Sequence, residues 1–140
     1  MKRIDLKNTK LVIWDMDDTF WKGTISESEI TPIEMNIELV KKLSDKGIMK
    51  SICSKNDFSV CEKELKKLGM WEYFIHPSIN WESKGQRVKK IIEKCNLKAE
   101  DVIFLDDNRR NRSDARKCNP GITTCFPSKI KKIAAQANEL

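Results

Sequence analysis

Short apolar runs alternate with helical patterns along the whole sequence, and this alternation constrains the fold more than any other feature. Leu11–Trp14 and Val102–Leu105 are continuous apolar runs, which are typical of parallel strands buried on both faces. Further strands are predicted at 48–53, 73–75 and 122–126, and helical spacing predicts helices at 33–46, 57–68, 84–95, 109–117 and 128–138. Strands that alternate with helices indicate an α/β fold, a three-layer doubly wound parallel sheet.

Length and cysteine usage indicate a single domain in a reducing compartment. The 140 residues suit one domain, 1–140, and 39% of them are hydrophobic, which allows a core without disulfide bonds. The five cysteines are an odd number and form no CxxC pair, and no apolar leader or membrane-spanning stretch is present. We therefore expect a cytoplasmic protein with reduced cysteines. The scattered cysteines and the single histidine, His76, argue against a zinc site.

The formal net charge of +6 permits an anionic substrate or partner but does not demand one. Lysines that only solvate the surface explain the same excess. No base-stacking or groove-reading motif accompanies the charge, so a nucleic-acid partner is not expected. The sequence does not specify an oligomeric state.

Three polar residues lie at the predicted strand ends. Asp15, Ser54 and Asp106 each follow an apolar strand directly. In parallel α/β sheets, ligands bind outside the carboxyl ends of the strands. We therefore expect these three side chains to converge on one crevice.

The carboxylates at these strand ends suit phosphoryl transfer with a metal ion. Asp15 can attack phosphorus as a nucleophile, and Asp17 can protonate the leaving oxygen as a general acid. With Asp106 and Asp107, four carboxylates gather, and their repulsion predicts a bound Mg²⁺. The competing interpretations are a solvated acidic turn after the first strand and, for Asp106-Asp107, acids that favour a helix N-terminus.

Two further residues complete a phosphoryl site. Ser54 offers a hydroxyl, and the turn that follows offers backbone N–H groups, although Ser54-Lys55-Asn56-Asp57 is also typical of a helix cap. Lys84 can offset the developing negative charge, although a lysine is more often an ordinary surface residue.

In this order, the motifs resemble those of the haloacid dehalogenase-like (HAD) superfamily of phosphohydrolases. The order is Asp15-Met16-Asp17-Asp18-Thr19, then Ser54, then Lys84, then Asp106-Asp107. The wording of these segments is similar to that of subfamily IIIC, which includes the FkbH-like glyceryl-transfer proteins, over about residues 10–126. The segments are Thr19-Phe20-Trp21, Ile52-Cys53-Ser54-Lys55-Asn56, Asn80-Trp81-Glu82-Ser83-Lys84 and Phe104-Leu105-Asp106-Asp107-Asn108.

The resemblance implies a HAD-like Rossmannoid fold and a role for each matching residue. Asp15 would be the nucleophile and a magnesium ligand, and Asp17 the general acid/base with its backbone carbonyl on the metal. Asp106 and Asp107 would complete or support the metal site. Ser54 and Lys84 would hold the phosphoryl group, and Thr19 would support the first loop. Thr19, Lys55 and Asn56 would also bind the substrate. Two positions depart from the pattern: Arg109 replaces a usual proline, and Phe20 a common leucine.

The spacing between motifs leaves no room for the cap domain that many members of this superfamily carry. One helix and one strand fill each of the segments between Asp15 and Ser54 and between Ser54 and Lys84. We therefore expect an open, uncapped site. Such a site suits a large phosphorylated substrate, such as a protein, a carrier-bound group or a sugar phosphate, or a small one closed off by a partner.

Several residues near the motifs have two interpretations. Arg109, Arg112 and Arg116 share one helix face, which is either a basic rim for a second anionic group or a solvated surface. Trp21 and Trp81 flank motifs and are candidates to line the crevice, whereas Trp71 is expected in the core.

The leading functional hypothesis is a magnesium-dependent phosphomonoesterase that acts through an aspartyl-phosphate. The alternative is glyceryl- or acyl-group transfer from a phosphorylated glycerate to a carrier protein, for which Cys53 is the nearest thiol. FkbH-like proteins with that activity are generally longer than this chain. A response-regulator-like phosphoacceptor is disfavoured because Cys53-Ser54 stands where such a module needs an aspartate.

Overall fold

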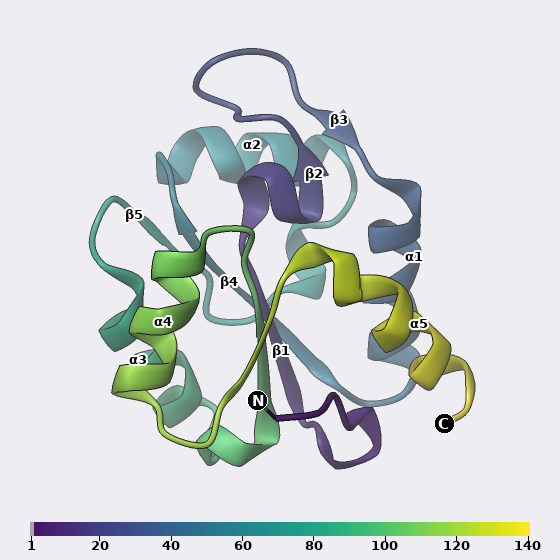
Figure 1. The fold of residues 1–140 in the computed structure, drawn as a ribbon. Helices are drawn as coiled ribbons and strands as arrows, with labels where there is room; N and C mark the ends of the chain where they lie inside the picture. The colour runs from purple at the N-terminus through teal and green to yellow at the C-terminus, as the bar shows by residue number, and fades with distance from the viewer. Residues whose placement is uncertain (1) are drawn as a thin grey trace.

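The computed structural model describes residues 2–140 and has a five-stranded parallel sheet at its centre (Figure 1). The strand order is β5-β4-β1-β6-β7. The strands are β1 (Leu11–Trp14), β4 (Met49–Lys55), β5 (Ser78–Asn80), β6 (Val102–Leu105) and β7 (Thr123–Cys125). The most apolar strands, β1 and β6, are central and buried along their whole length, as their continuous apolar runs predicted.

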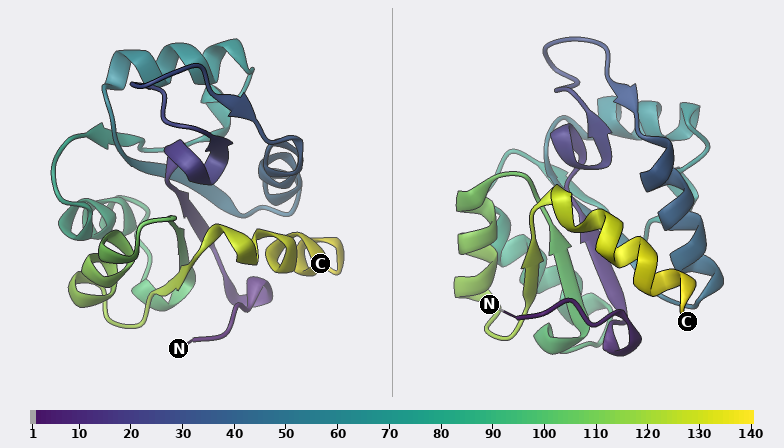
Figure 2. Two further views of the ribbon diagram at one scale, coloured as in Figure 1. Left: turned by 45° about the horizontal axis from the view of Figure 1, so that its top comes forward. Right: turned by 45° about the vertical axis from the view of Figure 1, so that its right-hand side comes forward.

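Helices cover both faces of the sheet, so the predicted three-layer arrangement is confirmed (Figures 1 and 2). Alternate residues of β1 face opposite layers. Val12 and Trp14 pack in the cluster that contains α1 (Glu34–Asp45), α2 (Phe58–Lys67) and α5 (Ile130–Asn138). Leu11 and Ile13 pack in the cluster that contains α3 (Lys84–Lys94) and α4 (Arg109–Cys118).

The predicted helices at 33–46, 57–68, 84–95 and 109–117 are confirmed as α1 to α4. The last helix begins with a 3₁₀ turn, Pro127–Lys129, before α5. The strand predicted at 48–53 is longer than expected, because β4 continues to Lys55. Ser54 is therefore the penultimate residue of a strand rather than the residue after it, and it pairs with Ile79 of β5.

The strand predicted at 73–75 is wrong. A 3₁₀ turn, Trp71–Tyr73, occupies part of this stretch, and the edge strand is β5, three residues beyond it. The apolar side chains there serve the core: Phe74 is buried and makes an edge-to-face contact with Phe20 at 5.7 Å. His76 then adopts a positive φ of 46°, which turns the chain into β5.

The sequence patterns did not reveal the small structure that follows β1. Met16–Phe20 forms one wide helical turn in which Asp18 has a positive φ of 54°. Then β2 (Trp21–Lys22) pairs antiparallel with β3 (Thr31–Pro32). Strands of two residues are too short to show an alternating pattern, so this hairpin leaves no signal in the sequence.

Within residues 2–140, the segments between the motifs contain no inserted domain. The chain between β1 and β4 forms only the wide turn, the hairpin and α1, and the chain between β4 and α3 forms only α2, a 3₁₀ turn and β5. Among the described residues, no helix is both long and apolar enough to span a bilayer.

Candidate active site

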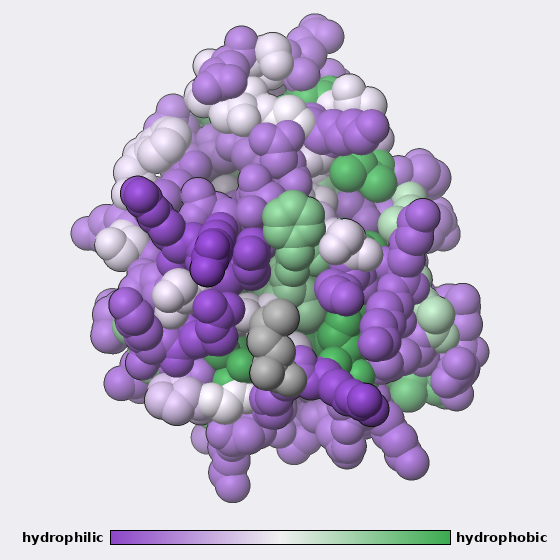
Figure 3. All heavy atoms as spheres, viewed as in Figure 1, coloured by the Kyte–Doolittle hydropathy of each residue, from purple (hydrophilic) through white to green (hydrophobic). Residues whose placement is uncertain are grey.

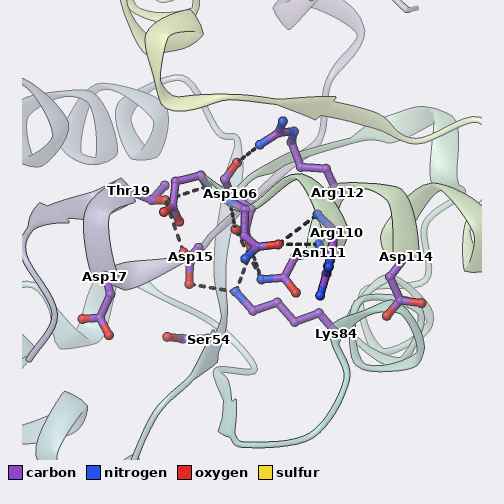
Figure 4. Close-up of polar contacts among 12 residues, drawn as sticks. Asp15, Asp17, Thr19, Ser54, Lys84, Asp106, Arg110, Asn111, Arg112 and Asp114 are labelled. Atoms are coloured by element: carbon purple, nitrogen blue, oxygen red, sulfur yellow. Dashed lines mark hydrogen bonds and ion pairs between the residues drawn. The ribbon is translucent and has the colours of Figure 1, made fainter. Parts of the chain in front are cut away.

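The carboxyl ends of β1, β4 and β6 meet at one edge of the sheet and carry the polar residues of the motifs (Figure 4). The register sets this meeting, because Trp14, the last residue of β1, is paired with both Ile52 and Leu105. Asp15 and Asp106 follow at once, and the first residue of α3, Lys84, reaches the same edge. The convergence predicted from the strand ends is therefore present in the structure.

Lys84 is the centre of a buried ion cluster. Its Nζ donates to Asp15 Oδ1 at 2.8 Å and to Asp106 Oδ2 at 2.6 Å. The Lys84 side chain is 1% exposed, so this is not an ordinary surface lysine. Burial on its own would lower the pKa of Lys84, but the charges of Asp15 and Asp106 outweigh it and raise the pKa above the usual value. The lysine is therefore held as a cation.

The three carboxylates of this site have raised pKa values. Burial raises the pKa of Asp15 to about 6, although the Lys84 ammonium works in the opposite direction. Burial also raises the pKa of Asp106 and of Asp107, and the Asp15 charge adds to the effect on Asp106. Burial is the main cause of all three shifts, and among the described residues Lys84 is the cation that forms ion pairs with Asp15 and Asp106.

The same three carboxylates could share a cation. Asp15, Asp106 and Asp107 each offer an oxygen within 4.8 Å of the others. A few carboxylate oxygens with free positions for water and phosphate are the ligands that Mg²⁺ prefers. The residues present therefore fit the predicted magnesium ion. The Asp17 carboxylate lies outside this group, and the backbone-carbonyl role that the resemblance implies for Asp17 stays a prediction.

Thr19 joins the first motif to the last. Its hydroxyl lies 3.2 Å from Asp15 Oδ2 and 3.3 Å from Asp107 Oδ1, and it accepts the Asp107 N–H at 3.1 Å. Asn36 of α1, which the sequence analysis missed, donates its side-chain amide to the backbone carbonyls of Thr19 and Phe20. Thr19 is buried, and its roles in supporting the first loop and binding substrate stay predictions.

Among the described residues, Asp17 accepts hydrogen bonds from neutral donors only. Its Oδ1 accepts the Trp21 indole N–H at 2.9 Å and the Ile25 backbone N–H at 3.1 Å, and its Oδ2 accepts the Asn56 amide at 2.8 Å. Trp21 is fully buried, so the prediction that its ring lines the crevice is wrong. Its ring packs edge-to-face with Phe20, while its indole N–H donates to Asp17.

Ser54 has a buried hydroxyl that suits a phosphoryl oxygen. It is 1% exposed, and its Oγ has no hydrogen-bond partner among the described residues. A buried hydroxyl without a partner is costly unless a ligand or water completes it. Figure 4 shows the hydroxyl at the same end of the sheet as Asp15, Asp17 and Lys84.

Residues 15–125 match the family model of the haloacid dehalogenase-like hydrolases. The chain belongs to this family.

Relatives of this family member include a human protein and several solved structures. Human magnesium-dependent phosphatase 1 is 23% identical, over 77% of this chain and 73% of the human protein. The N-terminal part of the Bacteroides fragilis protein BF1531, which contains a phosphatase domain and is complexed with Mg, has a TM-score of 0.79 at 25% identity. That match covers 93% of this chain but only 40% of the other, so this chain spans less than half of that structure.

A third relative shares the fold at lower identity. The 3-deoxy-D-manno-octulosonate 8-phosphate phosphatase of Moraxella catarrhalis, solved with magnesium ion, phosphate ion and its sugar acid, has a TM-score of 0.69 at 15% identity. This match covers 96% of this chain and 88% of the other. The predicted magnesium cofactor thus agrees with relatives that use or bind magnesium and with the aspartate cluster of this chain.

The remaining predicted site residues of this family member differ in exposure. Lys55 and Arg109 are exposed, and among the described residues neither forms an ion pair with an aspartate of the cluster. Trp81 is 59% exposed and donates its indole N–H to Asp57 at 2.8 Å. Trp71 is half-buried and makes an edge-to-face contact with Phe58, so it belongs to the periphery of the core.

Sequence reasoning missed Arg87, which braces the phosphoryl segment from behind. This buried side chain donates from Nη1 and Nη2 to the Ser54 carbonyl at 3.1 and 3.0 Å, and also to the carbonyls of Ser78 and Asn80. It makes no ion pair among the described residues. In the sequence, the one hint of its position is that Arg87 lies three residues after Lys84, which places both on one face of a helix.

Proposed function

We propose that this chain is a magnesium-dependent phosphatase that hydrolyses phosphate monoesters through an aspartyl-phosphate on Asp15. The observation that carries the proposal is the buried cluster in which Lys84 bridges Asp15 and Asp106 beside Asp107. Such a cluster holds the Asp15 carboxylate in place and offers positive charge to an incoming phosphoryl group. The magnesium dependence of the human relative supports the same assignment.

Asp15, Asp106 and Asp107 would hold the magnesium ion, which supplies charge neutralisation on the transferring phosphoryl group. An Asp15 oxygen attacks phosphorus while the bond from phosphorus to the leaving oxygen breaks. Asp17 gives its proton to that leaving oxygen. Asp17 then takes a proton from water, the water oxygen bonds to phosphorus, and the Asp15–phosphorus bond breaks to release phosphate. Ser54 and Lys84 bind phosphoryl oxygens throughout.

We also propose an open site, because neither inter-motif segment contains a cap domain. An open site accommodates a sugar phosphate, a carrier-bound phosphate or a phosphoprotein. The segments of this chain that resemble the motifs of subfamily IIIC support placement in that group. The sugar-acid phosphatase among the structural relatives makes sugar phosphates the first substrates to screen.

The transfer alternative finds no support at the nearest thiol. Cys53 is fully buried, and burial raises the pKa of its thiol to about 11, so it is neither exposed nor ionised. We therefore do not propose glyceryl or acyl transfer.

Replacing the nucleophile tests the proposal. Asp15→Asn should lower turnover of an aryl phosphate with magnesium by about 10³-fold or more, because the amide does not form the intermediate. Asp45→Asn, at an exposed position of α1, is the matched control and should keep wild-type activity. Mass spectrometry of quenched wild-type enzyme should show a gain of one phosphoryl group on the peptide that contains Asp15. A folded Asp15→Asn variant with undiminished turnover would contradict the proposal.

A further inference from the structure

A second concave surface lies away from the aspartate cluster, at the β7 edge of the sheet between α4 and α5. It is a groove of about 490 Å³ whose lining includes seven basic side chains and no acidic one. α4 contributes Arg109, Arg112 and Arg116, the 3₁₀ turn before α5 contributes Lys129, and the first turn of α5 contributes Lys132. In Figure 3, hydrophilic side chains over α4 and α5 flank a more apolar strip. The N-terminal segment adds two further basic residues, Lys2 and Arg3, to the lining.

The cations of this groove are not neutralised by the fold. Among the described residues, none of its basic side chains forms an ion pair with a carboxylate. They also converge from different elements. Lys129, Arg112 and Lys132 all act electrostatically on the Cys125 thiol in the groove and oppose the rise that burial causes in its pKa. Cations that converge in a concave surface focus a positive potential there, which favours an anion.

The groove is distinct from the phosphoryl site. Figure 4 shows Arg112 and Lys84 on opposite sides of Asp106. Arg112 donates to the backbone carbonyl of Asp106 at 2.9 Å, and the Asp106 N–H donates to the Cys125 carbonyl at 3.2 Å. The two surfaces therefore share a wall, the main chain at Asp106.

The dimensions and chemistry of the groove select a class of ligand. From Arg109 to Arg116 the axis of α4 rises about 10 Å, so the charges are spread too widely for one phosphate. The volume lies in the range of small-molecule sites, roughly 300–1,000 Å³. Phe126 is 49% exposed, and the Arg112 guanidinium lies over its ring at 5.2 Å, which offers a flat surface beside the charges.

We propose that this groove binds a small molecule that carries two or more phosphate groups, with its organic ring against Phe126. The site is independent of hydrolysis at Asp15. It explains why the arginines of α4 and the lysines near the start of α5 face one hollow, which a solvated helix surface does not require.

Binding without divalent cations isolates this groove, because the bare carboxylates near Asp15 repel anions. Isotope-labelled protein is titrated with tripolyphosphate and followed by amide NMR. Saturable shifts are expected at Thr124, Phe126 and along α4, and not at Thr19 or Ser54. Orthophosphate should bind at least about tenfold more weakly, since it meets fewer of the cations.

Paired variants distinguish specific binding in the groove from nonspecific attraction to the positive charge of the protein. Arg116→Gln with Lys132→Gln should weaken tripolyphosphate binding by about tenfold or more, because two charged contacts are lost. The control is Lys41→Gln with Lys42→Gln, at two exposed positions of α1. It changes the net charge equally and should alter binding by less than about twofold. Phe126→Ser should weaken adenosine diphosphate but not tripolyphosphate.

Three results would overturn the proposal. The first is the absence of saturable shifts with tripolyphosphate, and the second is equal weakening in both paired variants. The third is that a short single-stranded oligonucleotide shifts the same amides and binds more tightly than tripolyphosphate, which would make the groove a nucleic-acid site.

Discussion

Asp15 and Asp17 are two residues apart, but opposite kinds of contact hold them. Asp15 belongs to a buried ion cluster, where Lys84 bridges it to Asp106. Asp17 belongs to a neutral cradle made by Trp21, Asn56 and the Ile25 backbone. In the proposed mechanism the nucleophile must stay fixed beside a positive charge, whereas the general acid/base must transfer a proton, and among the described residues no ion pair holds Asp17. If the proposed mechanism holds, the ion cluster serves stability and nucleophilic attack, and the cradle positions the residue that transfers the proton.

The largest effect is expected from Lys84→Met, which removes the cation of the ion cluster. Two buried carboxylates lose their partner, so the free energy of unfolding at neutral pH without magnesium should fall by about 3–5 kcal/mol. The loss should shrink at acidic pH, where the carboxylates take up protons. Denaturant unfolding measures both. Lys90→Met, exposed on the same helix, is the control, and equal stability of the two variants would contradict the ion-cluster account.

Asp17→Asn tests the cradle and should lower activity far more than stability. The rate should fall by about 10²–10⁴-fold with alkyl phosphates, which need a proton on the leaving oxygen. The fall should be smaller with nitrophenyl phosphate, whose leaving group is a weak base. Steady-state kinetics with both substrates measure the difference. An equal loss for both would assign Asp17 a positioning role instead.

Magnesium affinity should depend on pH through the ion cluster. Because burial raises the pKa of Asp15 to about 6, a proton competes with the metal below that pH. Affinity should rise by up to about tenfold per pH unit toward pH 6 and level off above it. Without metal, the raised pKa favours the folded state at low pH, and this contribution is lost as pH rises from 3.8 through about 6. Calorimetric titration from pH 5 to 8 checks the slope, and a flat profile would contradict the shift.

The smallest effect is expected from Trp21→Phe, which removes one donor of the cradle and keeps an aromatic ring. The lost hydrogen bond should cost about 1 kcal/mol of stability and a few-fold in kcat, because Asn56 and the Ile25 N–H still hold Asp17. Trp71→Phe, half-buried and remote from Asp17, is the control. A shift of the pH–rate profile in Trp21→Phe alone would show that the indole acts through Asp17.

The sequence predicted the parts of the fold that depend on period and order. Leu11–Trp14 and Val102–Leu105 are central strands because continuous apolar runs are stable only when both faces are covered. The prediction of a strand at 73–75 was wrong because three apolar residues can pack in the core without pairing in a sheet. Phe74 does so through its contact with Phe20. The β2–β3 hairpin was missed because its strands are two residues long.

For the candidate site, the sequence by itself determined which chemical groups arrive at one sheet edge. Asp15 and Asp106 follow parallel strands, and parallel strands end on the same side. The tertiary structure alone decided what holds each group. It buried Lys84 between two carboxylates, turned Trp21 inward to Asp17, placed Arg87 behind Ser54 and gathered the α4 arginines into a groove. These contacts join residues far apart in sequence or depend on side-chain direction and burial, none of which a local pattern records.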